Sequence, residues 1–166
     1  MNVLEHLEPK SVFRFFEEMC AIPHGSRNTK AVSDWGADFA RARGLEYHQD
    51  GDNNIIIIKE AAPGYEAAPP VILQGHLDMV CEQTADCQKD MSREGLDLAV
   101  DGDFVYAKGT TLGGDDGIAV AMALALLDAE GLPHPRLEAV FTVDEEIGLL
   151  GAASIDVTPL KGRQML

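Results

Sequence analysis

The sequence predicts an α/β fold in which helices and strands share one core. In some segments the apolar residues repeat with the period of a helix, and in others they form the short continuous runs typical of strands. The two kinds of segment are interspersed along the chain, as in α/β domains. The chain has 166 residues, 46% hydrophobic and 25% charged, which suffices for one domain with a sizeable core. No linker or internal repeat is visible, so we assign residues 1–166 to one domain.

Two amphipathic helices are predicted in the first part of the chain. Residues 9–20 carry apolar side chains at helical spacing. A second helix is expected to begin at a cap provided by Ser26 or Asn28 and to run to about Arg43. Gly44 is a plausible stop for this helix, because glycine readily adopts the left-handed conformation that follows many helices.

Short apolar runs predict the strands. The run Ile55–Ile58 is consistent with a strand buried on both faces. Residues 61–70 contain three prolines and a glycine and are expected to form a surface loop. The predicted strands cover residues 45–49, 54–59, 71–74, 98–100, 104–107 and 137–143, with the fourth and fifth forming a hairpin.

The last predicted elements are two helices and the start of a strand. The helix over residues 118–130 has no polar face for ten residues, so we expect it to be buried and its N-terminus to open inside the protein. A short helix is predicted near Leu149. The apolar pair Met165–Leu166 looks like the opening of a strand, so we also expect an exposed sheet edge and apolar surface there.

The charge of the chain bears on its partners. With 13 Lys and Arg against 28 Asp and Glu, the net charge is −15, which argues against nucleic acid and anionic membrane surfaces as partners. Residues 1–6 lack the basic and apolar stretches of a signal peptide, and the apolar run over 118–127 is about half a bilayer span. We therefore expect a cytoplasmic protein without membrane partners that can hold cations.

The number and spacing of the three cysteines are consistent with a location in the reducing cytoplasm. Cys20, Cys81 and Cys87 cannot all pair within the chain and show no metal-binding spacing, so reduced thiols are the simplest interpretation. A bridge between Cys81 and Cys87 is the alternative.

Three polar clusters lie where predicted strands end or a helix begins, and such positions can converge at one edge of an α/β sheet. In the first, His76 and Asp78 are two residues apart in an extended segment and point the same way. The carboxylate could then accept the second ring N–H of a metal-bound imidazole. A purely structural hydrogen bond is the alternative.

The second cluster is the glycine-rich run 109–117 with Asp115 and Asp116 before an apolar helix. A buried helix start would make an uncompensated carboxylate costly, and a cation would offset that cost. A tight turn with an aspartate cap is the alternative.

The third cluster is Asp144, Glu145 and Glu146 after the strand 137–143. Adjacent extended residues point in opposite directions, so Glu145 and Glu146 are not expected to share one role. One could bind a metal while the other holds a proton, although three acids on a solvated turn is the alternative. Together the clusters form a mixed nitrogen and oxygen ligand set, which suits zinc, cobalt or manganese and predicts a dinuclear metallohydrolase.

The segments 74–80, 109–117 and 144–148 resemble the zinc-dependent M20 metallopeptidase family of aminoacylases and di- and tripeptidases. The segment 22–26 and the Gly-Thr-Thr-Leu-Gly run are most similar to its branch of bacterial aminoacyl-histidine (Xaa-His) dipeptidases. The resemblance implies a mixed-sheet three-layer αβα zinc-peptidase-like catalytic domain that is incomplete in this chain.

Position by position, the resemblance implies that His76 binds the first metal, Asp115 bridges two divalent metals and Glu146 binds the second. Zn²⁺ is the default, with Co²⁺ or Mn²⁺ open. Asp78 would orient His76, and Glu145 would be the general base for hydrolysis of a small peptide. The resemblance also implies a cis peptide bond between Asp115 and Asp116.

The family's catalytic domain has parts that do not occur in residues 1–166: one further acidic ligand, one histidine ligand, and a lid domain that contributes to substrate binding and dimer contacts. We therefore expect residues 1–166 to form the N-terminal part of that domain, in a parent that is a homodimer through the lid. Each ion would keep two protein ligands here, so the isolated chain is expected to bind metal poorly and to be inactive. The alternatives are another amide hydrolase of this family, such as a tripeptidase or N-acyl amino acid deacylase, and a non-catalytic metal- or partner-binding domain.

Overall fold

A computed structural model describes residues 3–166 of the chain; the first two residues of the N-terminal segment considered for a signal peptide lie outside them. The fold is a mixed α/β structure with one five-stranded sheet and one separate hairpin. The elements are α1 (Lys10–Cys20), α2 (Lys30–Ala42), β1 (Glu46–Gln49), β2 (Ile55–Lys59), β3 (Val71–His76), β4 (Leu98–Asp101), β5 (Phe104–Ala107), α3 (Gly114–Asp128), β6 (Leu137–Thr142), α4 (Leu150–Ser154) and β7 (Gln164–Met165).

The main sheet has the strand order β1-β2-β6-β3-β7. β1 and β2 form an antiparallel pair, β2 is antiparallel to β6, and β3 runs parallel to both β6 and β7. In the parallel pair, His76 at the end of β3 lies beside Thr142 at the end of β6. The chain therefore leaves both strands at the same edge of the sheet, and the polar segments that follow them come together.

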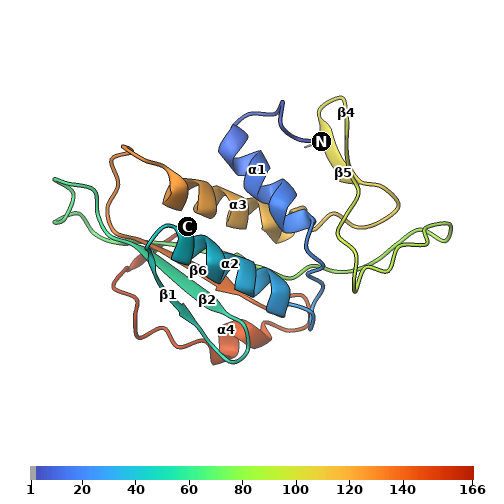
Figure 1. Cartoon of the computed structure of the whole chain (residues 1–166). Helices are drawn as coiled ribbons and strands as arrows, with labels where there is room; N and C mark the ends of the chain where they lie inside the picture. Colours follow the sequence, from blue (N-terminus) through green and yellow to red (C-terminus); the bar gives the residue numbers. More distant parts are fainter. Residues whose placement is uncertain (1–2) are drawn as a thin grey trace.

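The sheet lies between two layers, as the predicted αβα arrangement requires. Figure 1 shows α1, α2 and α3 on one side of the sheet and the short α4 on the other. Ile55 and Ile57 of β2 belong to the core under the three helices. Ile56 and Ile58 face the other way and pack with Ile155 and its neighbours after α4. The Ile55–Ile58 run is thus buried on both faces, as predicted.

The second helix begins differently from the prediction, and its cap assignment was wrong. The N-cap of α2 is Thr29, without a side-chain cap hydrogen bond. Ser26 and Asn28 are engaged elsewhere, because the Ser26 hydroxyl donates to Asp78 and the Asn28 side-chain amide donates to the backbone oxygen of Ser92. The predicted stop is confirmed, since Gly44 has a φ of +64° directly after the helix.

The expectation that the apolar helix is buried was also wrong in part. α3 packs on α1 and β3 through one side, where Val120 and Leu124 are fully buried. On its other side Met122 is 51% exposed and Leu126 is 37% exposed. An apolar sequence identifies a helix without a polar face, but the neighbours present determine how much of that helix is covered.

Other expectations can be checked on the described residues. Met165 and Leu166 are exposed at the edge of the sheet beside β3, which confirms the apolar edge predicted there. Cys20, Cys81 and Cys87 are free thiols, so the alternative Cys81–Cys87 bridge does not form. Among residues 3–166, no helix combines the length and the apolar character that crossing a membrane requires.

A buried acid in the middle of the sheet fixes the segment that leads into β7. Glu138 of β6 is completely buried and accepts a hydrogen bond from the Arg136 guanidinium at 2.7 Å. The backbone N–H groups of Lys161 and Gly162 also donate to its carboxylate, at 2.9 Å each for the closest contacts. Arg136 in turn pairs with Glu60. A buried charge is stable only when its partners are complete, so this acid ties the segment 161–162 to the sheet.

We expect Glu138→Gln to lower the free energy of unfolding by about 3 kcal/mol, because the Arg136 charge stays buried while its main partner becomes neutral. Urea unfolding of both proteins measures this loss. Glu46→Gln is the control, since Glu46 is exposed and its side chain pairs with the exposed His48, and its loss should stay below about 0.5 kcal/mol. Equal losses in the two variants would contradict this role of Glu138.

Candidate metal centre

The candidate site lies at the sheet edge where β3 and β6 both end. β3 delivers His76, and Asp78 follows two residues later. The loop after β6 carries Glu145 and Glu146, and the first turn of α3 carries Asp115. These three segments are distant in sequence, and the parallel pairing of β3 with β6 and the packing of α3 on β3 bring them together.

Gly75 makes the close approach of α3 possible. A Cβ atom at this position would lie 3.0 Å from Asp116 Oδ2 and 3.2 Å from Val120 Cγ2. The glycine therefore lets the start of α3 lie directly against the end of β3, beside His76.

The His76 ring is oriented by its surroundings. Its Nδ1 lies 3.0 Å from the backbone oxygen of Asp78 and 3.5 Å from Asp78 Oδ1. Both neighbours of Nδ1 are acceptors, so Nδ1 donates the proton and Nε2 is left to face the acidic groups. Nε2 lies 3.2 Å from Asp115 Oδ1 and 3.9 Å from Glu145 Oε2. The predicted contact with the Asp78 carboxylate thus exists, but the backbone oxygen of the same residue is nearer.

The acids around His76 change its proton affinity. The hydrogen bond with the Asp78 side chain raises the pKa of His76 to about 9, although burial acts against this rise. The imidazole therefore carries a proton at neutral pH when no cation is near, and a metal ion at Nε2 would have to displace it.

Asp78 is the centre of the hydrogen-bond network. It is 1% exposed, and its carboxylate accepts hydrogen bonds from the Ser26 hydroxyl at 2.7 Å, the Glu145 N–H at 3.0 Å and the Glu146 N–H at 3.4 Å. Burial alone would raise the pKa of Asp78, but these donors and His76 outweigh it and lower the pKa to about 2. The carboxylate is therefore ionised at neutral pH, and it holds the loop with Glu145 and Glu146 beside His76.

Glu145 and Glu146 both point toward His76. One carboxylate oxygen of each lies, together with a ring nitrogen of His76, in a group whose atoms are all within 4.8 Å of one another. The expectation that the two side chains point apart was wrong, because it assumed an extended backbone. Asp144 instead has a φ of +54° and is followed by a turn over residues 145–148, which lets consecutive carboxylates reach the same place.

The aspartate pair at the start of α3 divides its roles differently from the prediction. The Asp115–Asp116 peptide bond is cis, as expected. The Asp115 side chain is 92% exposed, so the helix does not start inside the protein. Asp116 turns inward, its Oδ2 accepts a hydrogen bond from the His76 N–H at 3.3 Å, and burial raises its pKa.

The donor set fits a divalent cation. An imidazole nitrogen and the carboxylates of Asp115, Glu145 and Glu146 converge, and imidazole with carboxylate is a ligand combination of Zn²⁺, Co²⁺ and Mn²⁺. Acidic side chains placed this close repel one another, and a cation between them would offset that repulsion. The five residues predicted from the sequence therefore all lie in one cluster.

The sequence did not predict that residues 25–27 support this cluster. Ser26 was assigned to a helix cap, whereas it donates to Asp78. The next residue, Arg27, donates its backbone N–H to Asp144 Oδ1 at 2.6 Å. Gly25 forms an isolated parallel bridge with Met79. The sequence signals for this segment were its place between the two predicted helices and the family resemblance of residues 22–26, and neither identifies a partner.

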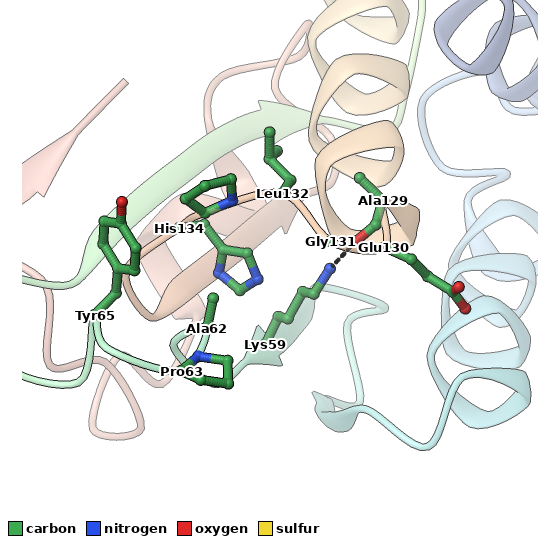
Figure 2. Close-up of a pocket in the computed structure, with 10 residues that line it drawn as sticks. Lys59, Ala62, Pro63, Tyr65, Ala129, Glu130, Gly131, Leu132 and His134 are labelled. Carbon is green, nitrogen blue, oxygen red and sulfur yellow. Dashed lines mark hydrogen bonds between the residues drawn. The ribbon is translucent and has the colours of Figure 1, made fainter.

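A groove elsewhere on the surface is separate from this cluster. Figure 2 shows Lys59, Tyr65 and His134 around the groove, and the Lys59 ammonium donates to the Ala129 backbone oxygen at 2.7 Å. Its volume is about 430 Å³. None of the five predicted site residues lines it.

Comparisons with known proteins show which family this chain resembles. The model of Peptidase family M20/M25/M40 matches residues 72–161, which include all five site residues. The cytosol non-specific dipeptidase of Escherichia coli K12 is 38% identical over 152 residues, which are 92% of this chain and 31% of that protein.

Solved structures with the same fold include two bacterial peptidases. The aminoacylhistidine dipeptidase of Vibrio alginolyticus superposes with a TM-score of 0.94 at 36% identity, covering 98% of this chain and 33% of that one. A tripeptidase of Staphylococcus aureus shares the fold with a TM-score of 0.77 at 22% identity, covering 94% of this chain and 42% of that one. The chain thus spans about a third of the length of the first two relatives.

We expect Ser26→Ala to raise the pKa of Asp78 from about 2 by about one unit, because the carboxylate loses a hydroxyl donor. A low native pKa makes the ionised carboxylate stabilising above its ordinary pKa of 3.8, and this contribution disappears as the pH falls toward 2. In the variant the contribution should be smaller, and its loss should be complete at a higher pH, because the native pKa lies closer to the ordinary value. Carboxyl-detected NMR titration measures the pKa directly.

Ser92→Ala is the matched control, since it removes a hydroxyl that donates to the exposed Asp90 at 2.6 Å. It should leave the pKa of Asp78 unchanged. An unchanged Asp78 pKa in Ser26→Ala would show that the hydroxyl does not support this carboxylate.

Proposed function

This chain belongs to peptidase family M20/M25/M40, and we propose that it forms the N-terminal part of the catalytic domain of a metal-dependent dipeptidase. The observation that carries the proposal is the convergence of His76, Asp115, Glu145 and Glu146 around the buried Asp78. Both the E. coli and the Vibrio relatives are named as dipeptidases. Most of the present chain aligns with about a third of each of them.

In the proposed site each side chain has its own task. His76 would bind the first ion through Nε2, Asp115 would be shared by two ions, and Glu146 would bind the second. This assignment is supported by the 3.2 Å approach of Asp115 to His76 and by the position of Glu146 beside the same ring. Asp78 keeps the imidazole in the required orientation and tautomer. Divalent ions, with Zn²⁺ as the first choice and Co²⁺ or Mn²⁺ as alternatives, would polarise the scissile carbonyl and lower the pKa of water.

Glu145 is the proposed general base. Its backbone N–H is held by Asp78 at 3.0 Å, and its carboxylate, 3.9 Å from His76 Nε2, lies beside the metal ligands. From there it can take a proton from the attacking water and return it to the leaving amine. The side chain is about one-third exposed, so substrate and water can reach it.

The proposed substrates are dipeptides of the Xaa-His type. The resemblance of residues 22–26 and 109–113 to the aminoacyl-histidine branch and the match to the Vibrio enzyme support this choice. The name of the E. coli relative, a non-specific dipeptidase, favours a broader range of dipeptides as the second candidate. A substrate panel of Xaa-His dipeptides, other dipeptides, tripeptides and N-acyl amino acids on the whole protein distinguishes these from the related amide hydrolases.

The remaining proposals concern the whole protein. We place it in the cytoplasm, in line with the name of the E. coli relative, and propose that it forms a homodimer through a lid domain beyond these residues. Sedimentation equilibrium of the whole protein tests the dimer. A non-catalytic metal-binding domain remains the alternative, which any metal-dependent peptide hydrolysis by the whole protein would exclude.

We expect Glu145→Gln in the whole protein to lower kcat for an Xaa-His dipeptide by about 10²–10⁴-fold, because the amide cannot accept the proton from water. Metal content, measured by mass spectrometry of the dialysed protein, should stay unchanged. Glu130→Gln, an exposed acid near the end of α3, should retain full activity. If Glu145→Gln keeps its activity, Glu145 is not the base.

The isolated 166-residue chain is expected to bind Zn²⁺ weakly and to leave dipeptides intact. Only His76 and Asp115 serve the first proposed ion and only Asp115 and Glu146 serve the second, whereas a stable catalytic zinc site usually has three protein ligands. Calorimetric titration and a dipeptide assay with amine detection measure both properties. Hydrolysis by the purified chain that a chelator abolishes would contradict this expectation.

A further inference from the structure

The loop that carries Glu145 and Glu146 is closed at its base. The Gly151 N–H donates to the Val143 backbone oxygen at 3.0 Å, so the residues on either side of the loop are paired. Inside the loop the Leu149 N–H donates to the Glu145 oxygen at 3.0 Å. Leu149, like Asp144, has a positive φ, here +59°. A branched apolar residue such as Leu149 rarely adopts this conformation, so its surroundings support it there.

One buried side chain joins both ends of this loop. Asn54, directly before β2, is 1% exposed, and its Oδ1 accepts a hydrogen bond from the Val143 N–H at 3.1 Å. Its Nδ2 donates to the Gly151 backbone oxygen at 3.2 Å and to Asp50 Oδ2 at 2.8 Å. The position therefore needs an acceptor and a donor on one short side chain, which an asparagine amide provides and an aspartate or alanine does not.

The backbone at Gly151 packs tightly against this contact. A Cβ atom added to Gly151 would collide with Asn54 Oδ1 and the Val143 backbone oxygen and would lie 2.8 Å from the Val143 nitrogen. The glycine thus allows the backbone to approach the amide directly. Asp50 holds Asn54 from the other side, because Asp50 Oδ1 also accepts the Asn54 N–H at 2.9 Å.

The loop accordingly has two anchors. Asp78 holds the Glu145 and Glu146 N–H groups from within the site, and Asn54 holds the base of the loop outside it. We propose that Asn54 is a positioning residue that sets the distance of the Glu145 and Glu146 carboxylates from His76. It does so through the loop and without touching the reacting groups. This inference deepens the proposed function and rests on it for its catalytic meaning.

The test compares Asn54→Asp with the unmodified 166-residue chain. Asn54→Asp keeps an acceptor for the Val143 N–H but replaces the donor with a charged oxygen that faces the Gly151 oxygen and Asp50. Val12→Ala is the matched control, because it removes buried apolar volume from α1 and should lower stability without touching the loop. All proteins are compared under conditions in which urea titrations show them folded.

The first readout is amide hydrogen exchange followed by NMR without metal. In Asn54→Asp we expect the Glu145, Glu146 and Gly151 amides to exchange at least about tenfold faster, while amides in the middle of β6 keep their rates relative to Val12→Ala. Loop amides that exchange alike in Asn54→Asp and Val12→Ala would overturn the proposal. If Asn54→Asp does not fold, Asp50→Ala removes one support of the amide and should produce a smaller change in the same loop amides.

The second readout is Co²⁺ binding by the whole protein, followed by visible absorption. We expect Asn54→Asp to weaken Co²⁺ binding by about 10- to 100-fold and Val12→Ala to leave it unchanged, as for residues that orient metal ligands. Equal Co²⁺ affinity in Asn54→Asp and the unmodified whole protein would overturn the positioning role. Absence of a Co²⁺ spectrum at saturating concentration in the unmodified whole protein would instead count against the proposed metal centre, and hydrogen exchange still decides the role of Asn54.

Discussion

The buried carboxylate of Asp78 is the interaction on which the rest of the site depends. It meets His76 on one side, the Ser26 hydroxyl on another, and the backbone of Glu145 and Glu146 on a third. A buried charge that loses its donors is costly, so these segments must be in place whenever Asp78 is ionised. The same requirement that stabilises Asp78 therefore orients an imidazole and brings two further carboxylates beside it. The need of the buried Asp78 carboxylate for hydrogen-bond donors thus accounts for both the stability of this region and the placement of the ligands.

The location of the site could be predicted from the sequence because each of its polar residues lies at or just after the end of a strand, or at the start of a helix. Each polar cluster follows a short apolar strand or precedes a helix, and parallel strands end at a common edge of the sheet. His76, Asp78, Asp115, Glu145 and Glu146 were selected on these grounds and on family resemblance, and the fold gathers all of them. The helices, strands and hairpin were predicted for the same reason, since apolar periodicity within a segment reports its type.

The features that were not predicted depend on partners distant in the chain. Ser26 has the chemistry of a helix cap, and only the folded chain shows that Asp78 is its acceptor. The common direction of Glu145 and Glu146 follows from the positive φ of Asp144, whose side-chain carboxylate accepts a hydrogen bond from the distant Arg27 N–H. The exposure of Met122 depends on what packs beside α3, which an apolar sequence does not specify. Asn54 is 89 residues from Val143, so no local pattern links them.

The location of the metal tests this account most directly. In crystals of the whole protein grown with Zn²⁺, anomalous scattering at the zinc edge gives the position of the ion independently of the protein atoms. The account predicts a peak at a bonding distance of about 2.0–2.2 Å from His76 Nε2 and an oxygen of Asp115. A fully occupied zinc peak bound by Cys81 or Cys87, or in the groove beside His134, with none at His76, would contradict it.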